Sequence, residues 1–250
     1  MEATALAYGL IGMGTALFGV CFWNSSRTVQ RAGQNGTIGF HLAAFSWTLS
    51  FMFAVMASII FLSEVAPHIL HAGSVVNKIG ITVATLIAVS LSTYLGILKI
   101  PLRITIPTIT ITGLALTALC ILSKHLPLID SMGRVQWNAP FIVSLGSLLL
   151  YAIMLFPLAL FFLFASLRIK DPQNRLHSAL LAGVFIIGFI VAGIDLMSGT
   201  GSSLFALPIH TGIRDGILAA FGLLTIMASI SFAAPLSLWR ANTNQNIQEH

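Results

Sequence analysis

Histidines are the residues of this chain best suited to bind a metal ion or a cofactor, and four of the seven stand at matched places in its two halves. His41 and His177 each follow a basic segment and lead into a long apolar run, whereas His71 and His210 each precede one. A neutral imidazole is a ligand for haem iron, copper or zinc. These pairs predict a haem b cofactor held by His41 and His177 near one membrane face and by His71 and His210 near the other.

Paired histidines near both faces of a helical bundle resemble the arrangement in polytopic b-type cytochromes. The resemblance covers that arrangement alone, since no family motif aligns with the chain residue by residue. It implies electron transfer between haems. The arginines expected to neutralise haem propionates, or an anionic partner, on the cytoplasmic side are Arg27, Arg31, Arg168 and Arg175.

Polar residues follow the two histidines of the second pair. Asn77 and Lys78 come shortly after the first, and Arg214 and Asp215 come shortly after the second. Charged groups avoid the hydrocarbon core of a bilayer. We therefore expect this pair of histidines, and the polar residues beside it, to lie in the hydrated interface.

Three further side chains have the spacing of a metal site. Glu64, His68 and His71 stand at i, i+4 and i+7 and would share one face of a continuous helix. Carboxylate and imidazole groups of this kind can bind a metal ion. Pro67 would interrupt such a helix, and the alternative is a solvated outer loop that happens to contain histidines.

Asp195 is the only acidic residue well inside an apolar run. A carboxylate at membrane depth is costly, so it is a candidate functional group by default. One interpretation is a path for protons, ions or substrate. The alternatives are an ion pair with Arg214 or Lys78, and a side chain that reaches the interface because it lies near the end of its span.

Hydroxyl groups are unusually dense in the apolar run at 104–122. Thr108, Thr110 and Thr112 follow or flank Pro107 there. Such hydroxyls either line a polar path, here together with Asp195, or form hydrogen bonds with their own helix backbone.

Composition predicts an all-α, polytopic integral membrane protein. Hydrophobic residues make up 57% of the 250 positions and charged residues 8%, with a mean hydropathy of +0.96, whereas a soluble domain carries about 25% charged residues. Seven apolar runs are long enough to cross a hydrocarbon core of about 30 Å, and in lipid such runs must be helices. The predicted spans are 4–23, 38–62, 76–98, 104–122, 140–167, 179–197 and 217–239.

The basic residues predict the direction of the spans. Eight of the twelve lysines and arginines fall on one side, and the positive-inside rule makes that side cytoplasmic. The N-terminus is then outside and the C-terminus inside, in a multi-pass protein of the plasma membrane. The net charge of +5 is spread over the loops. The expected partners are therefore the lipid bilayer and other membrane subunits, and no nucleic acid.

The two halves of the chain share an order of short motifs, which indicates an internal duplication. Ser-x-Arg, Gln-Asn, His-x-Ala, Pro, His-x-Gly and Pro-Leu follow one another in both halves. Three spans on each side of a linker span make two parallel units, related by an axis along the membrane normal. The expected organisation is a first three-helix unit at 1–103, a linker helix and outer loop at 104–139, a second three-helix unit at 140–240 and a polar cytoplasmic tail at 241–250.

Three functional classes fit these features. The leading hypothesis is a membrane redox or cofactor-binding subunit similar to b-type cytochromes, because it alone explains why histidine recurs at matched positions. A small-solute or ion transporter or channel fits the 3+1+3 plan, which resembles that of SWEET-type sugar carriers, together with Asp195. A seven-helix sensor or accessory subunit of a larger complex is the third. No Gly-x-Ser-x-Gly or His-Glu-x-x-His motif supports hydrolytic chemistry.

Overall fold

A computed structural model describes residues 2–33, 36–63, 69–123, 127–129, 135–198 and 211–248. Within these ranges it contains seven long helices, which confirms the number predicted from the apolar runs. Each helix is long and apolar enough to cross a membrane. The helices are α1 (Glu2–Arg31), α2 (Thr37–Leu62), α3 (Leu70–Tyr94), α4 (Leu102–Leu122), α5 (Phe141–Arg168), α6 (Pro172–Ser198) and α7 (Thr211–Gln248).

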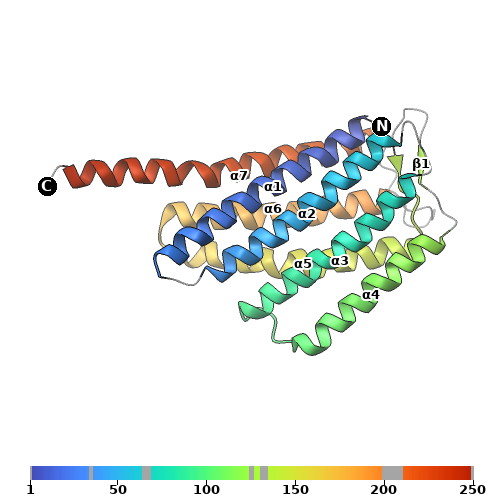
Figure 1. The fold of residues 1–250 in the computed structure, drawn as a ribbon, viewed down its shortest axis with the longest axis horizontal. Coiled ribbons are helices and arrows are strands. Elements are labelled where there is room, and N and C mark those ends of the chain that lie inside the picture. Colours follow the sequence, from blue (N-terminus) through green and yellow to red (C-terminus); the bar gives the residue numbers. More distant parts are fainter. Residues whose placement is uncertain are drawn as a thin grey trace.

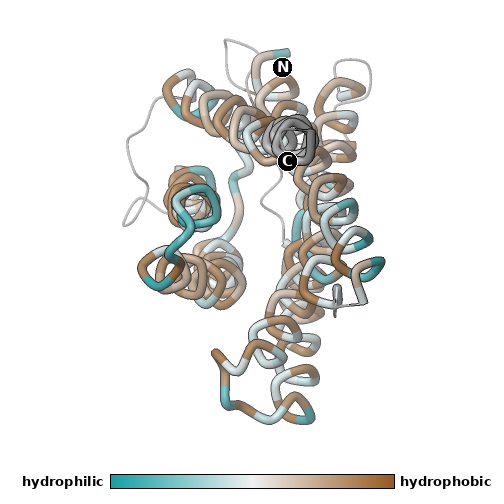
Figure 2. Tube along the Cα trace, turned by 90° about the vertical axis from the view of Figure 1, so that its left-hand side faces the viewer, coloured by the Kyte–Doolittle hydropathy of each residue, from teal (hydrophilic) through white to brown (hydrophobic). Residues whose placement is uncertain are grey.

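Six of these helices pack in a closed ring, and α4 lies outside it. Around the ring, α1 contacts α2, α2 contacts α3, α3 contacts α5, α5 contacts α6, α6 contacts α7, and α7 returns to α1. Helix α4 packs mainly against α3 and less extensively against α5. Figure 1 shows α4 at the edge of the bundle, and Figure 2 looks along the helices.

One short hairpin departs from the all-α prediction. Strand β1 (Leu128–Ile129) pairs antiparallel with β2 (Val135–Gln136) in the connection between α4 and α5. Helices α1, α3, α5 and α7 begin at this end of the bundle, and α2, α4 and α6 end there (Figure 1). We call it the hairpin end, and the other end of the bundle the opposite end.

Two helices begin earlier than the apolar runs predict. Helix α3 starts at Leu70 and α6 starts at Pro172, each well before the first apolar residue of the predicted span. Polar residues can continue a helix beyond its apolar stretch, and proline suits the first turn because its missing N–H would have no helical partner there. His71 and His177 therefore lie inside helices rather than just before them.

The outer surface of the bundle is apolar on all seven helices. Phe51 on α2, Leu122 on α4 and Met227 on α7 are 72%, 79% and 69% exposed. Soluble proteins rarely expose contiguous apolar patches larger than a few hundred Å². In Figure 2 hydrophobic residues run along the helices, and hydrophilic ones gather mainly at the turns. Such a surface is typical of a membrane protein.

Helices α1 and α7 approach each other closely at a pair of glycines. A Cβ atom on Gly14 would lie 3.0 Å from the backbone nitrogen of Ile226 and would overlap the side chain of Thr225. A Cβ atom on Gly222 would lie 2.9 Å from the backbone nitrogen of Ile11. A flexible side chain can change its rotamer to relieve a close contact, but the backbone atoms of a helix cannot move in this way. This crossing therefore requires residues without a side chain.

Gly14→Ala is expected to destabilise the bundle by about 1–3 kcal/mol, because the added methyl group overpacks the contact between α1 and α7. Gly9→Ala, on the same helix, is the matched control. Nothing lies within 4 Å of a Cβ atom at Gly9, so the gain in helix propensity should stabilise that variant by up to about 1 kcal/mol. The thermal unfolding midpoints of the two variants in detergent show whether each substitution stabilises or destabilises the bundle. Equal midpoints for the two variants would contradict this crossing.

Candidate functional site

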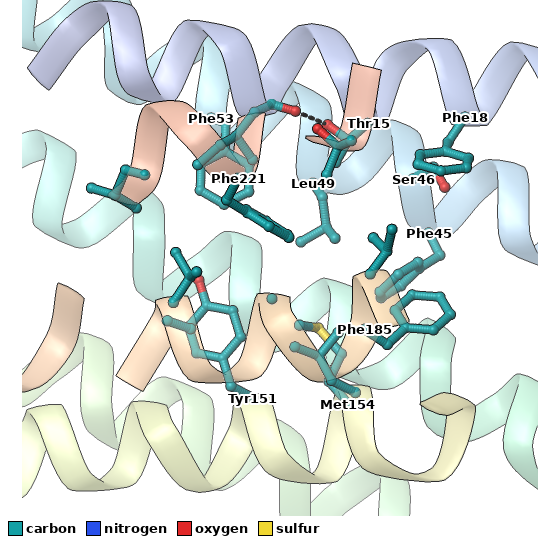
Figure 3. Close-up of a pocket in the computed structure, with 18 of the residues that line it drawn as sticks. Thr15, Phe18, Phe45, Ser46, Leu49, Phe53, Tyr151, Met154, Phe185 and Phe221 are labelled. Atoms are coloured by element: carbon teal, nitrogen blue, oxygen red, sulfur yellow. Dashed lines mark hydrogen bonds between the residues drawn. The ribbon is translucent and has the colours of Figure 1, made fainter. Parts of the chain in front are cut away.

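The ring of six helices encloses a cavity of about 90 Å³. Each helix of the ring contributes to its wall, and α4 contributes no described residue. The wall is mostly apolar and aromatic, as Figure 3 shows for side chains that converge from opposite sides. Asp195 of α6 is the only charged side chain among the described residues that line it. The predicted membrane carboxylate therefore lies in the wall of an internal cavity.

A chain of hydrogen bonds closes the cavity at the hairpin end. Trp137, between β2 and α5, donates from Nε1 to the hydroxyl oxygen of Tyr8 at 2.9 Å. The Tyr8 hydroxyl in turn donates to Asp195 Oδ2 at 2.7 Å. All three residues are at most 9% exposed. The chain joins the hairpin connection to α1 and α6 through groups that water does not reach freely.

Arg214 of α7 has no exposed surface and lies beside this chain. It donates from Nε and Nη2 to Asp215 Oδ1 at 3.1 and 2.8 Å. Its Nε also lies 3.8 Å from Asp195 Oδ1, as one of the sequence alternatives anticipated. Thr4 of α1 donates to Asp215 Oδ2 at 2.7 Å. One guanidinium therefore serves as the cation for two buried carboxylates, and a buried carboxylate without a cation would cost several kcal/mol.

Lys78 of α3 is buried near the same network, at 5% exposure. No carboxylate of the described residues lies within ion-pairing distance of its ammonium group. A second cavity, of about 20 Å³, lies beside it and is also lined by Asn77, Ser144 and Asp195. Asn77 Oδ1 and Ser144 Oγ are buried without a hydrogen-bond partner in the described part of the chain. A volume of this size can accommodate about one water molecule, which would bridge such groups.

Six phenylalanines form two groups at the opposite end of the large cavity, and four of them line its wall. Three of them join α1 to α7, and three join α2, α5 and α6. Neighbouring ring centroids lie between 5.7 and 6.2 Å apart, a range in which aromatic pairs stabilise a fold by about 0.5–1.5 kcal/mol beyond area burial. The first group is Phe18, Phe22 and Phe232, and the second is Phe45, Phe162 and Phe185.

The first pair of histidines lies away from the charged network. His41 Nδ1 is 2.9 Å from the carbonyl oxygen of Thr37, and its ring stacks on Tyr94 of α3. The ring of His177 stacks on Phe232 of α7, with centroids 4.4 Å apart. Each imidazole thus has its own aromatic neighbour on another helix. Haem ligation by the pair stays a prediction that these contacts do not test.

Most residues of the second histidine pair and of the predicted metal site lie outside the described residues. Glu64, His68 and His210 all lie there. His71 lies in the first turn of α3, where its Nδ1 is buried and has no hydrogen-bond partner among the described residues. Within the described ranges, no group of three histidine, cysteine or acidic side chains could hold a metal ion. Metal and haem binding at these positions remain untested.

The threonines of α4 are not brought to Asp195. Thr108 and Thr110 each donate to a backbone carbonyl one turn earlier, at 2.8 Å, and Thr112 is exposed. None of the three lines the cavity. Of the two sequence alternatives, backbone hydrogen bonding is the one observed for Thr108 and Thr110.

The expectation that Asn77, Lys78, Arg214 and Asp215 lie in a hydrated interface is wrong. All four are at most 7% exposed and are buried within the bundle. Their positions near helix ends did not predict the direction in which each side chain points. They point inward, where they can solvate one another.

Two hydroxyl partners of the acids were missed at the sequence level. Thr4 and Tyr8 stand four residues apart, which places them on one face of α1. That spacing was the available signal. Trp137 follows a hairpin in an irregular segment, where no periodicity predicts the direction of a side chain.

Comparisons of the chain with protein-family models, with curated proteins and with solved structures gave no match.

Arg214→Met is expected to lower the free energy of unfolding by about 3–5 kcal/mol, because two buried carboxylates lose their cation. Lys78→Met removes a buried cation of similar length that has no carboxylate within ion-pairing distance. Its expected cost is below about 1 kcal/mol, since replacing such a charge by an apolar side chain is often neutral. Thermal midpoints of both variants in one detergent measure the difference. Equal losses would show that Lys78, too, neutralises Asp195.

Proposed function

We propose that this chain is a proton-coupled carrier of small solutes in a membrane. The observation that supports the proposal is Asp195, a carboxylate in the wall of a cavity inside the six-helix ring. It is 7% exposed and accepts a hydrogen bond from Tyr8. Carboxylates within apolar spans are costly and are typical of proton and ion pathways. The redox hypothesis has no comparable support, since no described histidine lines the cavity.

The two ends of the cavity are closed by different chemistry, which suits alternating access. The hairpin end is closed by hydrogen bonds and ion pairs among Trp137, Tyr8, Asp195 and Arg214. The opposite end is narrowed by apolar phenylalanine rings. A carrier exposes its central site to one side at a time, so it needs two closures that open separately. The polar closure contains the carboxylate of Asp195, which can bind a proton.

Protonation of Asp195 is the step that opens the hairpin end. The ionised carboxylate attracts Arg214 of α7, and this attraction holds α6 against α7. A neutral carboxylic acid loses most of it, whereas Arg214 keeps its two close bonds to Asp215. The ionisable groups that surround Asp195 belong to four other helices and are Tyr8, Lys78, Tyr151, Arg214 and Asp215.

The order of helices in the ring supports an internal repeat. Exchanging α1, α2 and α3 with α5, α6 and α7 maps each contact of the ring onto another contact of the ring. We therefore propose two parallel units around the cavity, with α4 as the linker.

The distribution of basic residues supports an orientation for the carrier. Eight of the twelve lysines and arginines belong to segments at the opposite end, which we place in the cytoplasm of the cell by the positive-inside rule. The hairpin end and Asp195 then face the outside of the plasma membrane. The exposed apolar faces contact lipid and, in an assembly, other membrane subunits.

Access to the cavity is expected to depend on pH. In a Cys21→Ala, Cys120→Ala background, Ala192→Cys places a single thiol in the cavity wall, one helical turn from Asp195. In vesicles, a membrane-impermeant maleimide is added on the hairpin side. Its access to this thiol should increase as the pH falls, because protonation of Asp195 releases Arg214. The labelling rate must be corrected for the thiol itself, which reacts more slowly at low pH.

The same cysteine in an Asp195→Asn background supplies the control, since asparagine imitates the neutral carboxylic acid. Its labelling profile reports only the intrinsic effect of pH on the thiol reaction. We expect the ratio of the two labelling rates to favour the asparagine variant severalfold at high pH and to approach one at low pH. A ratio that does not change with pH would reject Asp195 as the proton-binding group.

A further inference from the structure

We infer that the solute of this cavity is a small organic ammonium ion, whose charged head binds at Asp195 and Asn77 and whose apolar part lies among aromatic rings. The inference rests on the carrier function proposed above and names its substrate class. Three independent properties of the cavity wall support it, namely its charge, its hydrogen-bonding groups and its aromatic surface.

The charge that the cavity presents is negative. Asp195 is the only charged side chain among its described lining residues. Arg214 does not line the cavity and is engaged by Asp215 at 2.8 and 3.1 Å, closer than its 3.8 Å approach to Asp195. Lys78 lines only the small second cavity. A cation in the large cavity therefore meets a carboxylate and no positive group of the described wall, whereas an anion would meet the carboxylate directly.

One hydrogen-bond acceptor of the wall, the side-chain oxygen of Asn77, has no donor among the described residues. Asn77 is 7% exposed and lines both cavities, and its Oδ1 has no hydrogen-bond partner among the described residues. A buried acceptor left without a partner costs about 1–3 kcal/mol. A primary ammonium group has three N–H donors, so it can donate to Asn77 Oδ1 and still form an ion pair with the Asp195 carboxylate. A carboxylate or an ether solute has none.

Aromatic rings surround the polar end of the cavity. Tyr8 and Phe53 stack with centroids 5.9 Å apart, and Figure 3 shows Tyr151 and Phe221 reaching toward the cavity from opposite sides. Ring faces attract cations by about 0.5–2 kcal/mol, more strongly where water is excluded. The cavity volume of about 90 Å³ is smaller than the roughly 150 Å³ of an apolar cavity that binds benzene. This volume restricts the apolar part of the solute to a short alkyl chain.

An ammonium ion and a proton then compete for one carboxylate. When the cation binds, the proton on Asp195 leaves to solvent, and the charge of the site plus its occupant stays the same. The carrier returns across the membrane with either occupant, so the movement of one cation in one direction is balanced by one proton in the other.

Titration calorimetry of the full-length protein in detergent tests this substrate class with three probes that share one alkyl chain: butylammonium, 1-butanol and butyrate. Butylammonium should bind at least tenfold more tightly than 1-butanol, butyrate should not bind, and the affinity for butylammonium should fall as the pH is lowered. Equal affinities for butylammonium and 1-butanol, tighter binding of butyrate, or an affinity independent of pH would overturn the inference.

Variants locate the ammonium group. Asp195→Asn should weaken butylammonium binding by about 30-fold or more, and Asn77→Leu by about tenfold. Asp171→Asn, the same substitution at the exposed residue that precedes α6, should leave it unchanged. Unaltered binding in folded Asp195→Asn protein would contradict the site. If butylammonium fails to bind while the labelling of Ala192→Cys still depends on pH, the ammonium ion is rejected and the carrier function is retained. If the labelling no longer responds to pH, the carrier function itself is rejected.

Discussion

A guanidinium group with no exposed surface must be surrounded by acceptors, and this requirement organises the hairpin end of the bundle. Arg214 meets it with the neighbouring Asp215 and, at a longer distance, with Asp195 of another helix. The acids are in turn held by hydroxyls of α1. Helices α1, α6 and α7 therefore cannot separate here without leaving a charge in apolar surroundings, which is far more costly than losing a contact between aliphatic side chains.

Because of this arrangement, the two ends of the cavity are stabilised by different kinds of interaction. Its hairpin end is stabilised by charge, so its strength depends on protons and on ions that reach Asp195. Its opposite end is stabilised mainly by aromatic packing. In a bundle with two equally apolar ends, opening either end would cost a similar free energy. Here the difference between the ends is built into the side chains.

The sequence predicted the helices much better than the site. The length of an apolar run decides whether a segment can cross a membrane, so seven helices could be counted without knowledge of their contacts. Which face of a helix points inward depends on its neighbours. Lys78 and Arg214 therefore resembled interfacial residues in the sequence and are buried in the structure. Asp195 was identified because a lone carboxylate in an apolar run is conspicuous by itself. Tyr8 and Trp137 gain significance only through contacts with residues more than a hundred positions away.

Trp137 gives the protein an internal optical probe. Its indole N–H is bonded to the hydroxyl that contacts Asp195, so the ring lies two hydrogen bonds from the charge that matters most. Trp23 and Trp47 are 38% and 39% exposed on the surface of the bundle, where their fluorescence reports on the surrounding lipid or detergent. Emission from a buried indole shifts with nearby charge. The ionisation of this carboxylate can thus be followed by tryptophan fluorescence in the unlabelled protein.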